Sequence, residues 1–115
     1  MGERLAAAAQ RHKFGVLGMH NLKEKMASKG VEFDREVRVF DVCNPQQAKD
    51  VLSNALEVST VLPCRISAFE RDGKTVLAMV RPTRLLNLFD LPGMEETAQS
   101  VEDTLAQIMH EAAAD

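Results

Sequence analysis

The sequence contains no tryptophan and no tyrosine, and it has only five phenylalanines among its 115 residues. Proteins that bind single-stranded nucleic acid stack the bases on aromatic side chains, so this composition argues against such a platform. The formal net charge is −3 and the lysines and arginines are scattered along the chain, so a phosphate backbone would meet no basic patch. We therefore expect no nucleic-acid partner.

Long apolar runs are also missing. No stretch approaches the roughly 20 apolar residues that a membrane-spanning helix needs. The N-terminal segment MGERLAAAAQRHK has no apolar run of the length found in signal peptides. The sequence therefore predicts a cytoplasmic protein without a membrane partner.

Cysteine is scarce, and the usual catalytic signatures are missing. Cys43 and Cys64 lie far apart and lack the CxxC spacing, which favours two reduced thiols over a structural disulfide or a zinc site. The chain has no Gly-rich phosphate loop, no GxSxG elbow and no HExxH motif. We therefore expect a binding function more than an enzymatic one.

A chain of this length corresponds to one domain, residues 1–115. Hydrophobic periodicity and capping signals predict helices over residues 3–12, 21–29, 45–55 and 94–114, a short helical or irregular segment over 83–90, and strands over 14–20, 36–43, 64–71 and 74–81. Because helices and strands neither alternate strictly nor segregate, the pattern predicts an α+β fold. We expect a two-layer sandwich with helices on one face of a small, mainly antiparallel sheet.

The dipeptide Asp72-Gly73 predicts a β-hairpin, because a type I′ turn needs positive φ at both of its central residues. With a two-residue loop, the register pairs Arg71 with Lys74, Ala68 with Leu77, Ile66 with Met79, and Cys64 with Arg81.

The clearest strand runs from residue 36 to Cys43. Phe40 and Val42 share one face, while Val37, Val39, Asp41 and Cys43 share the other. Because both faces carry apolar residues, we expect this strand to be central. Asp41 is expected to form a hydrogen bond or to reach an edge.

Cys43 directly precedes a helix that Asn44 is expected to cap and in which Pro45 takes the first position. The free N–H groups and dipole of a helix N-terminus favour a thiolate, so Cys43 could serve as nucleophile, persulfide carrier or metal ligand. The alternative is a small apolar residue packed at the end of a strand.

Cys64 is predicted to face Arg81, a cation that would also favour the thiolate. The alternative is a thiol facing the core beside Ile66. If the strands that carry the two cysteines are parallel, the thiols lie at opposite ends of the sheet; if they are antiparallel, they can approach one site. The sequence leaves both topologies open.

Met19 and His20 form a third candidate site. Both side chains can bind haem iron or copper. The alternative is an exposed histidine in a turn, since His20 has no ligand partner nearby in the sequence.

Four features in chain order resemble the family known as domain of unknown function 302: the segment KFGVLGMH, a CNP that opens a helix, an LPC further on, and a strand pair ending at Pro82. The resemblance covers about residues 5–82 and precedes the last helix, about 94–114. It implies a TATA-binding-protein-like α+β fold with a curved antiparallel sheet, often as a homodimer. Relatives often have a strand before the first helix, whereas this sequence begins with that helix. We therefore expect an exposed sheet edge here and a homodimer that covers it.

Three functions remain open. The first is a small ligand-binding or carrier domain with a site near the CNP and LPC motifs, in which haem could be bound by Cys43, Cys64, His20 or Met19. The second is a cysteine-based thiol or sulfur-transfer protein, which requires a lowered thiol pKa. The third is a structural or partner-binding module without catalysis.

Overall fold

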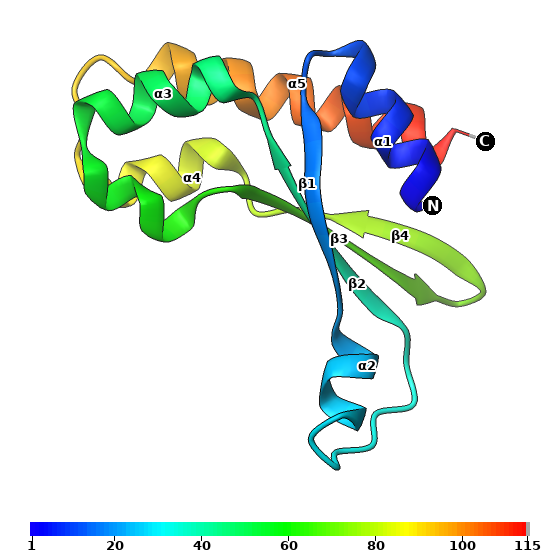
Figure 1. Ribbon diagram of the computed structural model, residues 1–115. Coiled ribbons are helices and arrows are strands. Elements are labelled where there is room, and N and C mark those ends of the chain that lie inside the picture. The colour runs from blue at the N-terminus through cyan, green and yellow to red at the C-terminus, as the bar shows by residue number, and fades with distance from the viewer. Residues whose placement is uncertain (115) are drawn as a thin grey trace.

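The structure is a computed structural model that describes residues 1–114. Its α-helices are α1 (Gly2–Arg11), α2 (Leu22–Ala27), α3 (Pro45–Asn54), α4 (Pro82–Leu86) and α5 (Glu95–Ala113), its short 3₁₀ helices are η1 (Leu56–Val61) and η2 (Asn87–Phe89), and its strands are β1 (Gly15–Asn21), β2 (Val37–Cys43), β3 (Cys64–Arg71) and β4 (Lys74–Ala78). The strands form one antiparallel sheet in the order β1-β2-β3-β4 (Figure 1). The predicted α+β class is confirmed, and β2 lies inside the sheet as expected.

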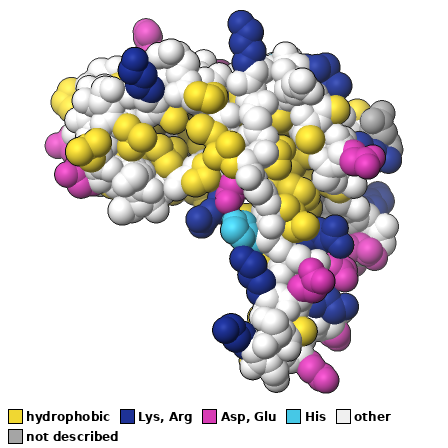
Figure 2. All heavy atoms as spheres, in the orientation of Figure 1, with side chains coloured by type: hydrophobic (Ala, Val, Ile, Leu, Met, Phe, Trp, Pro, Cys, Tyr) yellow, Lys and Arg dark blue, Asp and Glu magenta, His cyan; other side chains and the backbone are white. Residues whose placement is uncertain are grey.

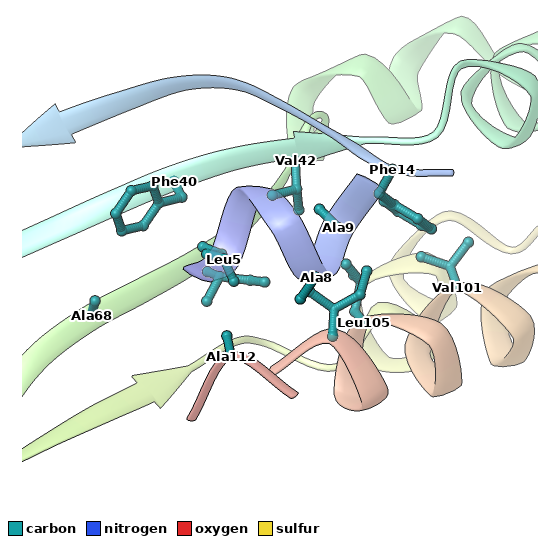
Figure 3. Close-up of a cluster of buried hydrophobic side chains, with 12 residues drawn as sticks. Leu5, Ala8, Ala9, Phe14, Phe40, Val42, Ala68, Val101, Leu105 and Ala112 are labelled. Carbon is teal, nitrogen blue, oxygen red and sulfur yellow. The ribbon is translucent and has the colours of Figure 1, made fainter. Parts of the chain in front are cut away.

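The main hydrophobic core lies between the sheet and the helices α1 and α5. Phe40 and Val42 are buried on the covered face of β2, as the alternation of the strand predicts. Figure 3 shows Leu5 of α1 and Leu105 of α5 in the same cluster. Because α1 is rich in alanine, its backbone can approach both the sheet and α5 closely. This layer holds the sheet in place and leaves the opposite face of β2 free of these helices.

The start of α3 follows the predicted capping pattern. The side chain of Asn44 accepts a hydrogen bond from the backbone N–H of Gln47 at 3.1 Å, and Pro45 occupies the first turn. This cap fixes the angle at which the chain leaves β2 at Cys43. The helix therefore projects over the end of the sheet.

The hairpin between β3 and β4 is only partly as predicted. Asp72 and Gly73 have φ values of 54° and 75°, and the predicted pairs Arg71–Lys74 and Ala68–Leu77 are present. The ladder ends at the pair Ser67–Ala78, so the predicted pairs Ile66–Met79 and Cys64–Arg81 are wrong. The strand stops because the chain turns away to begin α4 at Pro82, whose fixed φ suits the first position of a helix.

Strand β1 contains a bulge at Leu17. Val16 is opposite Val42 and Gly18 is opposite Asp41, so two steps along β1 match one step along β2. The far ends of β1 and β2, together with α2, extend away from the other helices (Figure 1). Within residues 1–114, no helix combines the length and the apolar character that crossing a membrane requires.

Candidate functional site

The two cysteines lie at the same end of the sheet. Strands β2 and β3 are antiparallel and Val42 pairs with Cys64, so β2 ends where β3 begins. The topology therefore selects the arrangement in which the thiols can approach one site. Both Cys43 and Cys64 are free thiols.

Both thiols line one small cavity, which we call the thiol cavity. It has a volume of about 50 Å³ and lies between α3, the segment that follows η1, α4 and the sheet. Helix α3 contributes Gln47, Ala48 and Val51, and the loop before β3 contributes Leu62. Figure 2 shows hydrophobic side chains gathered in the hollow between α3 and the sheet. The wall is therefore almost entirely apolar.

Burial raises the pKa of both thiols. Desolvation raises the pKa of Cys43, and desolvation followed by the charge of nearby Cys43 raises the pKa of Cys64 to about 11. The direction is opposite to the lowered pKa that thiol chemistry requires. The dipole of α3 does not outweigh burial at Cys43, and Arg81 is not paired with Cys64. Both groups are neutral thiols at pH 7.

A second hollow lies on the other side of Cys64, and we call it the outer hollow. Its volume is about 220 Å³, and Thr60, Arg65 and Val80 contribute to its lining. The two spaces share the side chains that stand between them, which are Val61, Cys64, Pro82 and Leu85. Cys64 therefore contributes to both spaces.

A polar cluster lies on the face of β2 that α1 and α5 leave free. The carboxylate of Asp41 contacts His20 Nε2 through Oδ2 at 2.8 Å and Arg65 Nε through Oδ1 at 3.4 Å. Lys25 Nζ lies 2.9 Å from His20 Nδ1. The Asp41 side chain is only 15% exposed, so these groups form its immediate environment. The expected hydrogen bond of Asp41 is confirmed.

The contacts of His20 define its tautomer. An ammonium group has three donors and no acceptor, so Lys25 donates to Nδ1 and this nitrogen must carry a lone pair. In this arrangement the Nε2–H of His20 donates to Asp41. The histidine is held by two partners on its two nitrogens. His20 therefore lies in a strand and not in a turn, and its side chain is 37% exposed.

The bulge at Leu17 is what brings His20 to Asp41. With the bulge, His20 pairs with Val39, which shares the free face of β2 with Asp41. Without it, His20 would pair with Arg38 and would point to the opposite face. The sequence gives no direct signal of this bulge except the small residue Gly18. The cluster of Lys25, His20, Asp41 and Arg65 was consequently not predicted.

The remaining predicted residues separate into two groups. Asn44 lines the thiol cavity and caps α3, whereas Pro45 is exposed and acts only on the helix. Arg81 is exposed at the start of α4, where its charge helps to lower the pKa of Glu102 after the hydrogen bonds from Thr83. Arg81 therefore belongs to the α4–α5 contact and not to the environment of Cys64.

Met19 and His20 do not join the thiols at one centre. Met19 pairs with Phe40 and His20 with Val39, so the two side chains point to opposite faces of the sheet. Val39 is four residues from Cys43, which corresponds to about 13 Å along the strand. Among residues 1–114, no group of three or more histidine, cysteine, aspartate or glutamate side chains is arranged to hold a metal ion.

The site does not fit haem. Pockets for small molecules usually have about 300–1,000 Å³, and the thiol cavity has about 50 Å³. The side chains suggested as axial ligands are spread over both faces of the sheet. We therefore derive no haem chemistry from these residues.

The comparisons with known proteins agree with the fold and with the resemblance noted from the motifs. The family model described as domain of unknown function DUF302 matches residues 2–112. The chain belongs to this family. A crystal structure described as an uncharacterized conserved protein DUF302 from Bacillus stearothermophilus is similar, with a TM-score of 0.89 and 34% sequence identity over 96% of this chain and 86% of the other. No curated protein matches the chain significantly.

Membership of the DUF302 family extends the resemblance beyond the motifs. The matched region includes α1 and most of α5, whereas the motifs cover only about residues 5–82. The long last helix is therefore part of the family's fold. Leu105 and Ile108 of this helix are buried in the core, so its apolar stripe is used within the domain.

Proposed function

We propose that this protein binds a small, mainly apolar ligand in the thiol cavity, and that it acts as a binding or carrier domain. The observation that carries this proposal is a cavity with an almost wholly apolar wall and two neutral thiols. Empty apolar cavities in proteins bind xenon or small hydrocarbons when their size permits. The volume of about 50 Å³ restricts the ligand in this conformation to a few heavy atoms.

The energetic cost of the cavity supports a functional reason for it. Apolar surface that lines an open hollow forgoes the roughly 25 cal/mol per Å² that its burial would contribute to stability. Replacing Ala48 or Val51 by a larger side chain would fill the space with little change elsewhere. A binding function explains why small residues line this position.

The raised thiol pKa values favour a contact role for the cysteines over nucleophilic chemistry. A neutral thiol behaves as a small, polarizable apolar group. Cys43 and Cys64 would then contact the ligand by dispersion without reacting with it. Sulfur transfer would require a thiolate at neutral pH, which burial disfavours here.

Native mass spectrometry of gently purified protein tests the proposal. We expect extra mass in the native spectrum that disappears on denaturation. Ala48→Leu places a larger side chain against the cavity and should abolish the extra mass. Ala7→Leu on the exposed side of α1 is the matched control and should retain it.

Two results would count against this function. A bare protein in both spectra contradicts a carrier that is loaded in the cell. Extra mass that survives denaturation indicates a modified cysteine and supports the thiol-chemistry alternative instead. Circular dichroism of Ala48→Leu and Ala7→Leu verifies that both variants are folded.

We also propose that the protein forms a homodimer. Strand β1 pairs with β2 and is an edge of the sheet, and Leu17 and Met19 on it are 66% and 44% exposed. Exposed edges are normally covered or paired. Light scattering at micromolar concentration should give twice the monomer mass, and a monomer would contradict the proposal.

A further inference from the structure

We propose that the ligand of the thiol cavity is a small neutral molecule with a hydroxyl group, a short-chain alcohol, whose hydroxyl donates a hydrogen bond to Gln47 Oε1. This inference rests on the proposed function and adds the chemical class of the ligand. It comes from a buried acceptor on a residue of the cavity wall, which finds no donor within residues 1–114.

The side chain of Gln47 stands between helix α5 and the thiol cavity. Its Nε2 lies 3.5 Å from Oγ of Ser100, an exposed residue of α5, while Gln47 is also one of the residues that line the cavity. The oxygen and the nitrogen of an amide diverge from one carbon, so Oε1 lies on the side away from Ser100. The amide therefore directs its nitrogen to the surface and its oxygen to the cavity.

The oxygen of this amide is left without a partner in the described part of the chain. Gln47 Oε1 is buried, and no donor among residues 1–114 reaches it. Only one of the two bonds of a capping box forms here, because the Gln47 N–H donates to Asn44 Oδ1 and Gln47 Oε1 does not return to Asn44. A buried acceptor without a donor destabilises a protein, so a ligand that supplies the donor gains affinity from it.

The surroundings of Oε1 favour a neutral donor over a cation. Among residues 1–114, no Asp, Glu, Lys or Arg side chain lines the thiol cavity. The thiols are neutral at pH 7, because burial raises the pKa of Cys43 and raises that of Cys64 to about 11. An ammonium group would be buried without a counter-charge, which costs far more than burying a hydroxyl that forms its hydrogen bond. A primary amide would bring a second donor and a carbonyl that the apolar wall leaves unpaired.

A titration with isomeric ligands tests the inference. n-Butanol and methyl propyl ether contain the same atoms, but only the alcohol has a hydrogen-bond donor. Their binding can be followed in ¹H–¹⁵N correlation spectra of the wild-type protein, at the backbone amides of Ala48, Val51 and Cys64 in the cavity wall. We expect n-butanol to bind about fivefold more tightly than the ether, which corresponds to one net hydrogen bond between neutral groups. Butylammonium should bind more weakly than n-butanol.

Glutamine variants locate the effect. Gln47→Leu removes the acceptor and keeps a side chain of similar size, so n-butanol and the ether should bind to it equally. Gln46→Leu is the matched control and should keep the full preference, because Gln46 is an exposed glutamine of the same helix whose amide donates to Asp50 at 3.1 Å. Thermal unfolding of both variants establishes that the fold survives. The comparison in the wild-type protein decides the inference even if Gln47→Leu does not fold.

The outcomes separate this inference from the proposed function. Equal binding of the two isomers to the wild-type protein, an unchanged preference in folded Gln47→Leu, or tighter binding of butylammonium than of n-butanol overturns the hydroxyl inference. If the ether or xenon still perturbs the cavity amides in that case, the proposed function stands. If n-butanol, the ether and xenon all leave these amides unperturbed, both fail.

Discussion

The domain contains two hydrophobic clusters of different quality. The first, which we call the inner core, has twelve buried residues between the sheet and the helices α1 and α5, among them Leu5, Ile66 and Leu105. The second, the outer cluster, has three buried residues, Val51, Val58 and Met94, surrounded by apolar side chains that are only partly buried.

The inner core contributes mainly to stability, whereas the outer cluster is less completely buried and borders the space proposed for a ligand. Dense packing in the inner core leaves little free volume, as is usual for protein interiors. The outer cluster lies under α3, η1 and α4. The thiol cavity lies where the two clusters meet, because Phe14, Val42 and Val101 of the inner core line it together with Val51 of the outer cluster. Short helices and partly buried contacts make this half easier to open. We infer that the inner core supports the sheet and that the space for a ligand lies at its border with the outer cluster.

The largest effect is expected in the inner core. Ile66→Ala removes a side chain that is 0% exposed and should lower the free energy of unfolding by about 2–5 kcal/mol. Urea unfolding followed by circular dichroism measures the change. A loss below about 1 kcal/mol would mean that the inner core tolerates a cavity, and the comparison would fail.

The second prediction concerns the reactivity of the site. A thiol with a pKa of about 11 has about 300-fold less thiolate at neutral pH than an ordinary cysteine of pKa about 8.5. Cys64 should therefore be alkylated by iodoacetamide at a correspondingly low rate in the folded protein. Peptide mapping by mass spectrometry of the wild-type protein, which resolves Cys64 from Cys43, measures this rate against urea-unfolded protein. Rapid alkylation of Cys64 in the folded protein would contradict the buried, neutral thiol.

The third prediction concerns the polar cluster. His20→Ala leaves Asp41 without the donor to Oδ2, which should lower the free energy of unfolding by about 1–3 kcal/mol. His110→Ala on the exposed side of α5 is the control and should stay within about 0.5 kcal/mol of wild type. Equal effects of the two substitutions would show that the cluster is not a stabilising unit.

The fourth prediction places a truncation in the wall between the thiol cavity and the outer hollow. Leu85→Ala removes a half-buried side chain, so the loss of stability should be about 1 kcal/mol, below that of Ile66→Ala. The same change should let larger apolar ligands bind, which calorimetry with apolar ligands of increasing size can measure. A loss of unfolding free energy as large as that of Ile66→Ala would show that Leu85 stabilises the fold as much as a residue of the inner core.

The smallest effect is expected where α1 meets α5. His12, at 2.5 Å, and Arg11, at 2.9 Å, contact the carboxylate of Glu111, and these contacts lower its pKa. Because the folded pKa is depressed, the stabilisation is complete above the unfolded value of about 4.3 and is lost as the pH falls through the lower folded value. Thermal melts of wild type and Glu111→Gln should therefore converge as the pH falls through the lowered folded pKa of Glu111. A difference in melting temperature that is independent of pH would contradict the ion-pair account.

The sequence was sufficient to predict the helices and strands and to point to the two cysteines of the candidate site, but not to the polar cluster. Alternation along residues 37–43, the Asn44 cap and the Asp72-Gly73 turn depend on neighbours in the chain, and all three are present. The Cys64–Arg81 pair required the ladder to extend, and the start of α4 at Pro82 ended it early. A local turn fixes a register but does not determine the length of the strand.

The polar cluster could not be predicted, because it depends on a one-residue bulge and on contacts between strands. His20 faces Asp41 only because of the bulge at Leu17, and Arg65 contacts Asp41 from the neighbouring strand β3. The thiol pKa values likewise depend on burial by α3 and α4, which the sequence does not show. Local signals about Cys43, such as the following helix, pointed in the opposite direction.

A crystal structure determined under xenon pressure would show directly whether the thiol cavity accepts an apolar ligand. We predict a xenon atom in the thiol cavity, between Ala48 and Cys64, in the wild-type protein and its absence in Ala48→Leu. Xenon only between the sheet and α1, away from the thiol cavity, or no xenon at all, would contradict the assignment of the border between the two clusters as the binding region of the domain.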